Sequence, residues 1–161
     1  MALNIHIKID GAEGDSVHTG HEKEIDVLAY SWGLSQSGSA HIGKGAGSGK
    51  VSIQDLSITK YVDKASSKLV LFGCNGAHIP KVVLTVSKVD GGTSMVYERL
   101  TLEDVIVSSF STGGSGGEDK LTENVTLNFG KFEFGYTPQK ADQTADTELK
   151  AGWKIPENEK V

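Results

Sequence analysis

The chain has 161 residues and a mass of 17.1 kDa, which predicts a single domain spanning residues 1–161. Its net charge of −5, with Arg99 as the only arginine, excludes the clustered basic surface that a nucleic-acid partner requires. Cys74 is the only cysteine, so no disulfide can form within the chain and packing must hold the fold.

The N-terminal segment favours a half-buried strand. Leu3, Ile5, Ile7 and Ile9 alternate with polar residues, which puts His6 on the solvent side. The same segment lacks the basic and apolar regions of a signal peptide, and no later stretch approaches the ~20 apolar residues of a membrane span. We therefore expect synthesis in the cytoplasm and no membrane insertion.

A second strand is predicted from Glu24 to Leu34. Leu28, Tyr30 and Trp32 share one parity and should pack inward, whereas the smaller Ala29 and Ser31 should face outward. The following segment, 33–50, is rich in glycine and serine and favours a long loop.

The pattern from Val51 to Tyr61 predicts another strand, with a bulge near Gln54 and Asp55 where the apolar parity slips. One short helix follows. Asp63 can cap it, Ala65, Leu69 and Phe72 recur at helical spacing, and Gly73 or Gly76 can end it.

The second half of the chain predicts more strands. Segments 81–89 and 93–102 flank Asp90-Gly91-Gly92, which is typical of a β-hairpin turn. Glu103 and Asp104 are interpreted as a bend. In the last long strand the apolar parity changes between Phe129 and Phe132, which predicts a bulge at Gly130.

Residues 137–161 form a polar C-terminal segment in which Trp153 and Ile155 indicate a late strand. The pattern as a whole is mainly β. It predicts a curved antiparallel β-barrel or sandwich with one short flanking α-helix.

Two glycine-rich motifs could suggest catalysis or nucleotide binding. GKGAGSGK (43–50) departs from the phosphate loop because a strand follows it rather than a helix, so we interpret it as a flexible loop. Gly113, Ser115 and Gly117 spell a nucleophile elbow, but a strand again follows. A serine hydrolase using Ser115 is therefore a weak alternative.

The remaining candidate chemistry is also weak. His18 and His21 lie near Asp15, Glu22 and Glu24 in an acidic surface segment, where solvated side chains are more usual than a metal site. Cys74 is interpreted as a small core residue rather than a nucleophile. We predict no enzyme activity, no metal and no cofactor.

Four segments carry a resemblance to a known family: EIDVLAYSWGLSQSG (24–38), VSIQDLSITKYVDK (51–64), VSSFSTGGSGGEDKLTENVTLNF (107–129) and YTPQKAD (136–142). They closely resemble the Hcp (hemolysin-coregulated protein) family, the tube subunits of the bacterial type VI secretion system. The resemblance covers nearly the whole chain.

The resemblance implies a fold like that of phage tail-tube proteins and a homohexameric ring. It further implies that rings stack into a hollow tube inside a contractile sheath, with a VgrG spike at the tip and small effectors in the lumen. The tube would be expelled from the cell, so the protein would be secreted without a cleaved signal peptide.

Two groups of residues are assigned to this assembly. A small open barrel leaves unpaired strand edges, which identical copies can cover for one another. The residues predicted to face the lumen are Ala29 and Ser31. The residues predicted at the contact between subunits are Gly38, Ser39, His41, Ile42, Gly43, Gly45, Gly47 and Trp153.

A monomeric β-sandwich that binds a sugar or peptide at Tyr30 and Trp32 is the other alternative. It would require those aromatic rings to be accessible.

Overall fold

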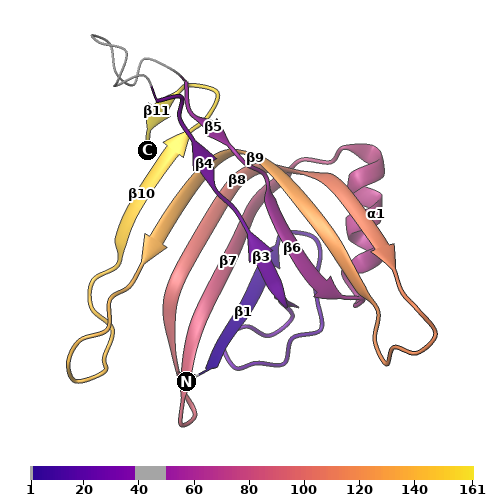
Figure 1. Cartoon of the computed structure of the whole chain (residues 1–161), viewed down its shortest axis with the longest axis horizontal. Helices are drawn as coiled ribbons and strands as arrows, with labels where there is room; N and C mark the ends of the chain where they lie inside the picture. The colour runs from indigo at the N-terminus through magenta and orange to yellow at the C-terminus, as the bar shows by residue number, and fades with distance from the viewer. Residues whose placement is uncertain (1, 39–49) are drawn as a thin grey trace.

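The computed structural model describes residues 2–38 and 50–161 (Figure 1). Its elements in chain order are β1 (Ala2–Ile9), β2 (Ile25–Asp26), β3 (Ala29–Ser31), β4 (Leu34–Ser35), β5 (Ser52–Ile53), β6 (Leu56–Tyr61), α1 (Ser66–Asn75), β7 (Ile79–Asp90), β8 (Thr93–Gly113), β9 (Thr122–Tyr136), β10 (Leu149–Lys154) and β11 (Glu159–Lys160). The chain is thus mainly β with one helix, as its side-chain alternation predicts.

Most strands belong to one antiparallel sheet in the order β11-β10-β9-β8-β7-β1-β2. β9 is the branching strand of this sheet. One edge pairs with β8, while the other pairs with β6 over Thr122–Leu127 and with β10 over Lys131–Tyr136. β3 extends the β6 branch, and β4 and β5 form a separate two-stranded sheet.

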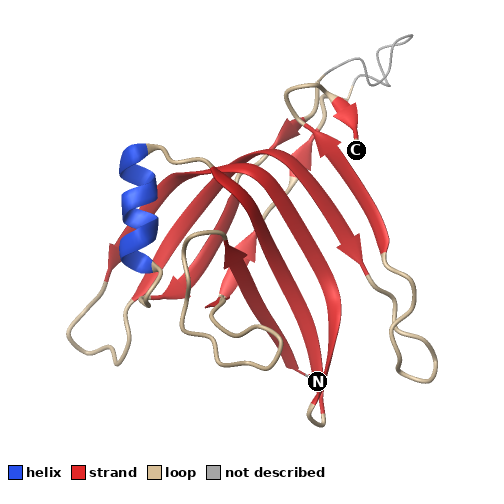
Figure 2. Ribbon diagram, turned by 180° about the vertical axis from the view of Figure 1, so that it is seen from behind, coloured by secondary structure: helices blue, strands red, loops and turns tan. Residues whose placement is uncertain are grey.

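The large sheet is strongly curved, and α1 lies along its side (Figures 1 and 2). Residues 25–31 connect its two ends. The Val27 N–H donates to the Ile5 carbonyl of β1 at 3.0 Å, and the Leu28 N–H donates to the Thr59 carbonyl of β6 at 2.8 Å. The strand ladder itself does not close, so the fold is a curled open sheet rather than a closed barrel.

The strand predicted from Glu24 to Leu34 is broken into β2, β3 and β4. The chain changes partner from β1 to β6 at Val27 and Leu28, and this crossing interrupts the alternation. The inward position predicted for Leu28 is therefore wrong, since its side chain is 45% exposed. Tyr30 and Trp32 do pack against the core.

The strand predicted from Val51 to Tyr61 is broken at Gln54 and Asp55 into β5 and β6, which belong to different sheets, so the change of parity marks a break rather than the predicted bulge. The predicted helix is confirmed. Asp63 does not cap it, however: the N-cap is Ala65, and the Asp63 carboxylate accepts the Ala65 N–H at 2.9 Å just before α1 begins. At the other end Gly76, with φ +64°, donates to the Phe72 carbonyl, so Gly76 rather than Gly73 ends the helix.

The predicted hairpin joins β7 and β8 through Gly91 and Gly92, whose φ angles are +56° and +88°. Both positions need a left-handed backbone, which glycine adopts without steric cost.

No inserted residue accompanies Gly130, so the bulge predicted there is wrong. The register with β8 is the same on both sides of this glycine, and β8 shifts against β9 at Val107–Ser109 instead. The change of buried parity is nevertheless real. In three neighbouring strands the buried side chains move from odd to even positions, or the reverse, at the same level of the sheet. The buried residues on either side of this change are Ile79 and Val82 in β7, Leu102 and Val105 in β8, and Phe129 and Phe132 in β9.

Asp104 lies at this level of the sheet with φ +55°, where the predicted bend is found, and its side chain faces Gly130. A Cβ at Gly130 would approach the Asp104 Oδ2 to 3.1 Å. The left-handed aspartate breaks the alternation of β8, and the glycine opposite leaves room for it.

The core fills the space inside the curved sheet and beneath α1. Its largest fully buried apolar side chains are Ile7, Ile25, Leu56, Ile58, Leu69, Ile79, Leu84, Leu100, Leu102 and Leu127. The late strand predicted around Trp153 and Ile155 is confirmed in part as β10, which contains Trp153, and both side chains pack against this core. Cys74 is exposed on α1, so its predicted place in the core is wrong.

Within residues 2–38 and 50–161, no helix has the length and hydrophobicity needed to cross a bilayer.

Candidate interaction surfaces

The segments that carry the family resemblance lie side by side in the sheet. β6 from the second segment pairs with β9 from the third, from Leu56 opposite Leu127 to Tyr61 opposite Thr122. Asp55, just before β6, accepts hydrogen bonds from Ser108 at 2.8 Å and from Asn128 at 2.9 Å. These bonds anchor the break between β5 and β6 to β8 and β9.

A buried charged cluster joins the same two strands to the helix. Lys60 is fully buried and contacts the nearly fully buried Glu123 carboxylate. Its Nζ also lies 2.9 Å from the Asp63 Oδ1 and donates to the Tyr61 carbonyl at 3.0 Å. The Ser66 hydroxyl, in the first turn of α1, donates to Glu123.

Sequence reasoning missed this cluster, although a signal was present. Lys60 has the same parity as Leu56 and Ile58, and Glu123 has the same parity as Val125. Opposite charges at inward positions of two strands indicate a buried pair, since an unpaired charge there would be too costly. The cluster ties the start of α1 to the β6–β9 pair, so its role is structural.

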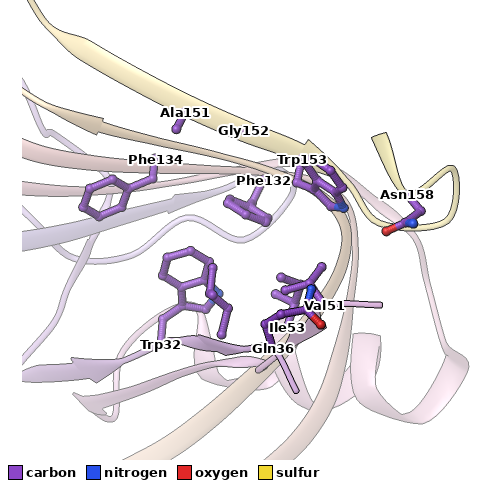
Figure 3. A pocket seen from close by; sticks show the side chains of 11 residues that line it. Trp32, Gln36, Val51, Ile53, Phe132, Phe134, Ala151, Gly152, Trp153 and Asn158 are labelled. Atoms are coloured by element: carbon purple, nitrogen blue, oxygen red, sulfur yellow. The ribbon is translucent and has the colours of Figure 1, made fainter. Parts of the chain in front are cut away.

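An apolar groove of about 640 Å³ lies where the β4–β5 sheet faces β9 and β10 (Figure 3). Its lining consists of Trp32, Leu34, Gln36, Val51, Ile53, Phe132, Phe134, Ala151, Gly152, Trp153 and Asn158. The Trp32 ring contacts Phe132 edge-on, with the two centroids 5.0 Å apart.

The indole nitrogens of Trp32 and Trp153 are both buried, and neither has a hydrogen-bond partner among the described residues. Buried N–H groups normally have acceptors. Such a groove suits contact with another chain more than permanent exposure to water.

The residues predicted for the lumen lie on β3, which has only β6 as a ladder partner within the described ranges. Ala29 and Ser31 are exposed, and Tyr30 between them turns toward the core. The Tyr30 hydroxyl donates to Glu98 at 2.9 Å. Burial, followed by this hydrogen bond, raises the pKa of Tyr30 to about 12.

The predicted subunit contact is only partly described. Gly38 is exposed and Trp153 lines the groove. Ser39, His41, Ile42, Gly43, Gly45 and Gly47 lie outside the described residues.

The weak catalytic alternative gains no geometric support. Ser115 sits in an exposed turn in which its carbonyl accepts the Glu118 N–H at 3.2 Å, and the next element is β9 rather than a helix. Across the ranges 2–38 and 50–161, no hydrogen bond joins its side chain to a histidine or carboxylate.

The His18 and His21 rings lie near each other, with centroids 5.8 Å apart. No group of three or more His, Cys, Asp or Glu side chains in the described part of the chain is arranged to hold a metal ion.

The class defined by the structure is a curled, mainly antiparallel β fold with short edge strands and an apolar groove. The sequence matches the family described as "Type VI secretion system effector, Hcp" over residues 6–136. It is 52% identical to Protein hcp1 of Pseudomonas aeruginosa over 98% of both chains. The chain therefore belongs to the Hcp family of type VI secretion proteins.

Solved structures agree with this assignment. A type six secretion system protein superimposes with a TM-score of 0.92 at 28% identity, covering 99% of this chain and 100% of the other. Hcp1 from Salmonella typhimurium has a TM-score of 0.82 at 32% identity, covering 100% of both. The mainly β fold of this chain is the Hcp fold, and as a family member the chain is a structural secretion protein and not an enzyme.

Proposed function

We propose that this chain is the subunit of the inner tube of a type VI secretion system. Six copies form a ring, and rings stack into a hollow tube. A contractile sheath expels the tube behind a VgrG spike, and small effectors travel in the lumen. The chain is made in the cytoplasm and leaves the cell with the tube.

The observation that carries this proposal is the 52% identity to Protein hcp1 of Pseudomonas aeruginosa over 98% of both chains. Features of the surface support self-association. The terminal strands β2, β3 and β11 have two or three residues each, and an edge strand offers unpaired N–H and C=O groups to a neighbouring chain. The groove beside Trp153 adds an apolar contact area.

We further propose that the contact between subunits includes Trp153 and residues 38–49, and that Ala29 and Ser31 face the lumen. The exposure of these two small side chains supports the second assignment. Small side chains would keep the channel open for cargo.

The decisive experiment combines light scattering with electron microscopy of the purified chain at micromolar concentration. We expect annular particles and a mass of six subunits. A stable species near 17.1 kDa would contradict the proposal. If that monomer bound a peptide or sugar in the groove beside Trp32, the chain would instead be a binding module.

A further inference from the structure

Three histidine rings pack together on the outer side of β1. His6 belongs to β1, whereas His18 and His21 belong to the connection 11–24 between β1 and β2. The His6 and His21 rings are stacked, with centroids 4.5 Å apart and planes inclined by 5°. The His18 ring lies 5.0 Å from His6 and 5.8 Å from His21.

The stack buries a histidine that the strand alternation predicts on the solvent side. His6 is only 3% exposed, so the predicted solvent position is wrong. Its Nε2 lies 3.2 Å from the Asp26 Oδ1. Its Nδ1 is buried, with no hydrogen-bond partner among the described residues.

The connection is anchored at its beginning by Ala12, which is buried in the core and bridged to Ile9. Beyond Ala12, its backbone hydrogen bonds are mainly to itself and to the start of β2. The Gly14 N–H donates to the Lys23 carbonyl at 2.8 Å, and the Lys23 N–H donates to the Ser16 carbonyl at 2.9 Å. The Ser16 N–H donates to the Glu24 carbonyl at 3.0 Å. The rings of His18 and His21 are thus a main contact between this connection and the middle of β1.

We propose that His6, His18 and His21 form an acid-sensitive clasp, which holds the connection 11–24 on β1 while the imidazoles are neutral and releases it when they are protonated. The clasp is a conformational switch within one subunit, and it does not rest on the proposed function.

The charges around His6 explain why its protonation opens the clasp. From the connection, His18 and His21 would become cations within 5.0 Å of the ring. Glu24 faces His21 at 3.1 Å, while Glu22 is turned toward the Gly20 N–H.

The other elements around His6 offer little compensation. From β2, Asp26 is 62% exposed, which weakens its attraction. From β7, the residue opposite His6 is the uncharged Thr85. On β1, Lys8 shares the His6 side of the strand by alternation and adds a positive charge. Cations therefore outweigh buried carboxylates once the three rings are protonated.

The pKa of His6 is shifted in the direction that opening on protonation requires. Burial, and then the charge of His21, lowers the pKa of His6 below its usual 6.5, while Asp26 and Glu24 act in the opposite direction. Because the unfolded or released form binds the proton more tightly, the clasp is stable above pH 6.5. Its stability falls as pH drops through 6.5 toward the lower pKa of the closed form.

The test is an NMR titration of the histidine ring protons in the full chain, with amide exchange measured at pH 7.5 and pH 5. We expect a His6 pKa below 6.5. We also expect exchange in residues 11–24 to accelerate about tenfold or more at pH 5, after correction for intrinsic rates, while exchange in β8 changes little. A His6 pKa at or above 6.5, or equal protection of 11–24 at both pH values, would overturn the proposal.

A variant series separates the clasp from general acid lability. His21→Asn should raise the pKa of His6, because it removes the neighbour with the largest charge effect. His78→Asn is the control, since His78 is 74% exposed and faces Asp104 instead. An unchanged His6 pKa in His21→Asn would refute the coupling. Measuring the mass at both pH values separates opening of the clasp from loss of subunit association.

Discussion

At the scale of single residues, buried polar groups distinguish this chain from a generic β protein. Lys60 and Glu123 are almost completely removed from water and satisfy each other with help from Asp63 and Ser66. A buried pair of this kind adds modest net stability, but the loss of one partner leaves an uncompensated charge. The pair therefore makes the β6–β9–α1 junction intolerant of substitution.

We predict that Glu123→Ala lowers the free energy of unfolding by about 3 kcal/mol, because Lys60 then remains buried with Asp63 as its only carboxylate partner among the described residues. Denaturant unfolding of the chain measures this change. Glu159→Ala is the control. It removes the exposed pair with Lys154, for which a change of at most ~1 kcal/mol is expected. Equal effects of the two substitutions would contradict the structural role of the buried pair.

Trp32 and Ser31 are adjacent residues with opposite surroundings. Trp32 packs on Phe132 but also lines the groove. Trp32→Ala should therefore lower the free energy of unfolding by about 2 kcal/mol, less than the ~3 to 5 kcal/mol expected for a fully buried tryptophan. Ser31→Gln should change the free energy of unfolding little because Ser31 is exposed. Instead it should leave ring formation intact and reduce effector export. Thermal melting and an export assay separate the two; equal destabilisation would show that the assignment of faces is wrong.

At the scale of elements, local sequence signals and long-range contacts decide different features. Gly76 ends α1, and the Gly91-Gly92 turn joins β7 to β8, where sequence predicts them. The prediction of one strand from Glu24 to Leu34 is wrong, because the backbone of this segment hydrogen-bonds first to β1 and then to β6. Side-chain alternation does not indicate which strand each part of this segment will pair with.

Two glycines of α1 provide a matched test at this scale. Gly73→Ala should stabilise the fold by up to ~1 kcal/mol, because the new Cβ would lie at an ordinary 3.6 Å from Val107 inside the helix. Gly76→Ala should destabilise it by about 1 kcal/mol, since φ is +64° there. Thermal melting of both variants shows whether each substitution raises or lowers the melting temperature. The same sign for both would show that Gly76 does not end the helix.

At the scale of the whole molecule, the curled sheet leaves edges and a groove that suit contacts between copies. Segment 38–49 has Ile42 as its main apolar side chain and is rich in glycine, which loses much conformational freedom when ordered. The composition of the segment offers little apolar side chain to offset that loss. This is the physical reason to propose the segment as a contact between subunits.

We predict that shortening residues 43–49 weakens ring formation or stacking but leaves the melting of dilute subunits nearly unchanged. Light scattering at several protein concentrations measures the first effect, and calorimetry of dilute protein measures the second. As a control, shortening the exposed turn 115–117 should leave the mass unchanged. Rings that persist at the same dilution after the 43–49 deletion would refute the proposed contact.

Local patterns were sufficient for the β-rich character, the helix and the hairpin. Each depends on backbone preferences and side-chain periodicity within a few residues. The resemblance to the Hcp family also rests on sequence alone, and the comparisons confirm it.

Other features exist only in the folded chain. His6 is buried because His18 and His21 return to cover it, and Lys60 is neutralised by Glu123, which lies 63 positions later. The parity change at Asp104 needs three neighbouring strands, and the groove needs Trp32 and Trp153 from distant segments. These features depend on the pairing of residues far apart in sequence, and local periodicity cannot specify such pairing.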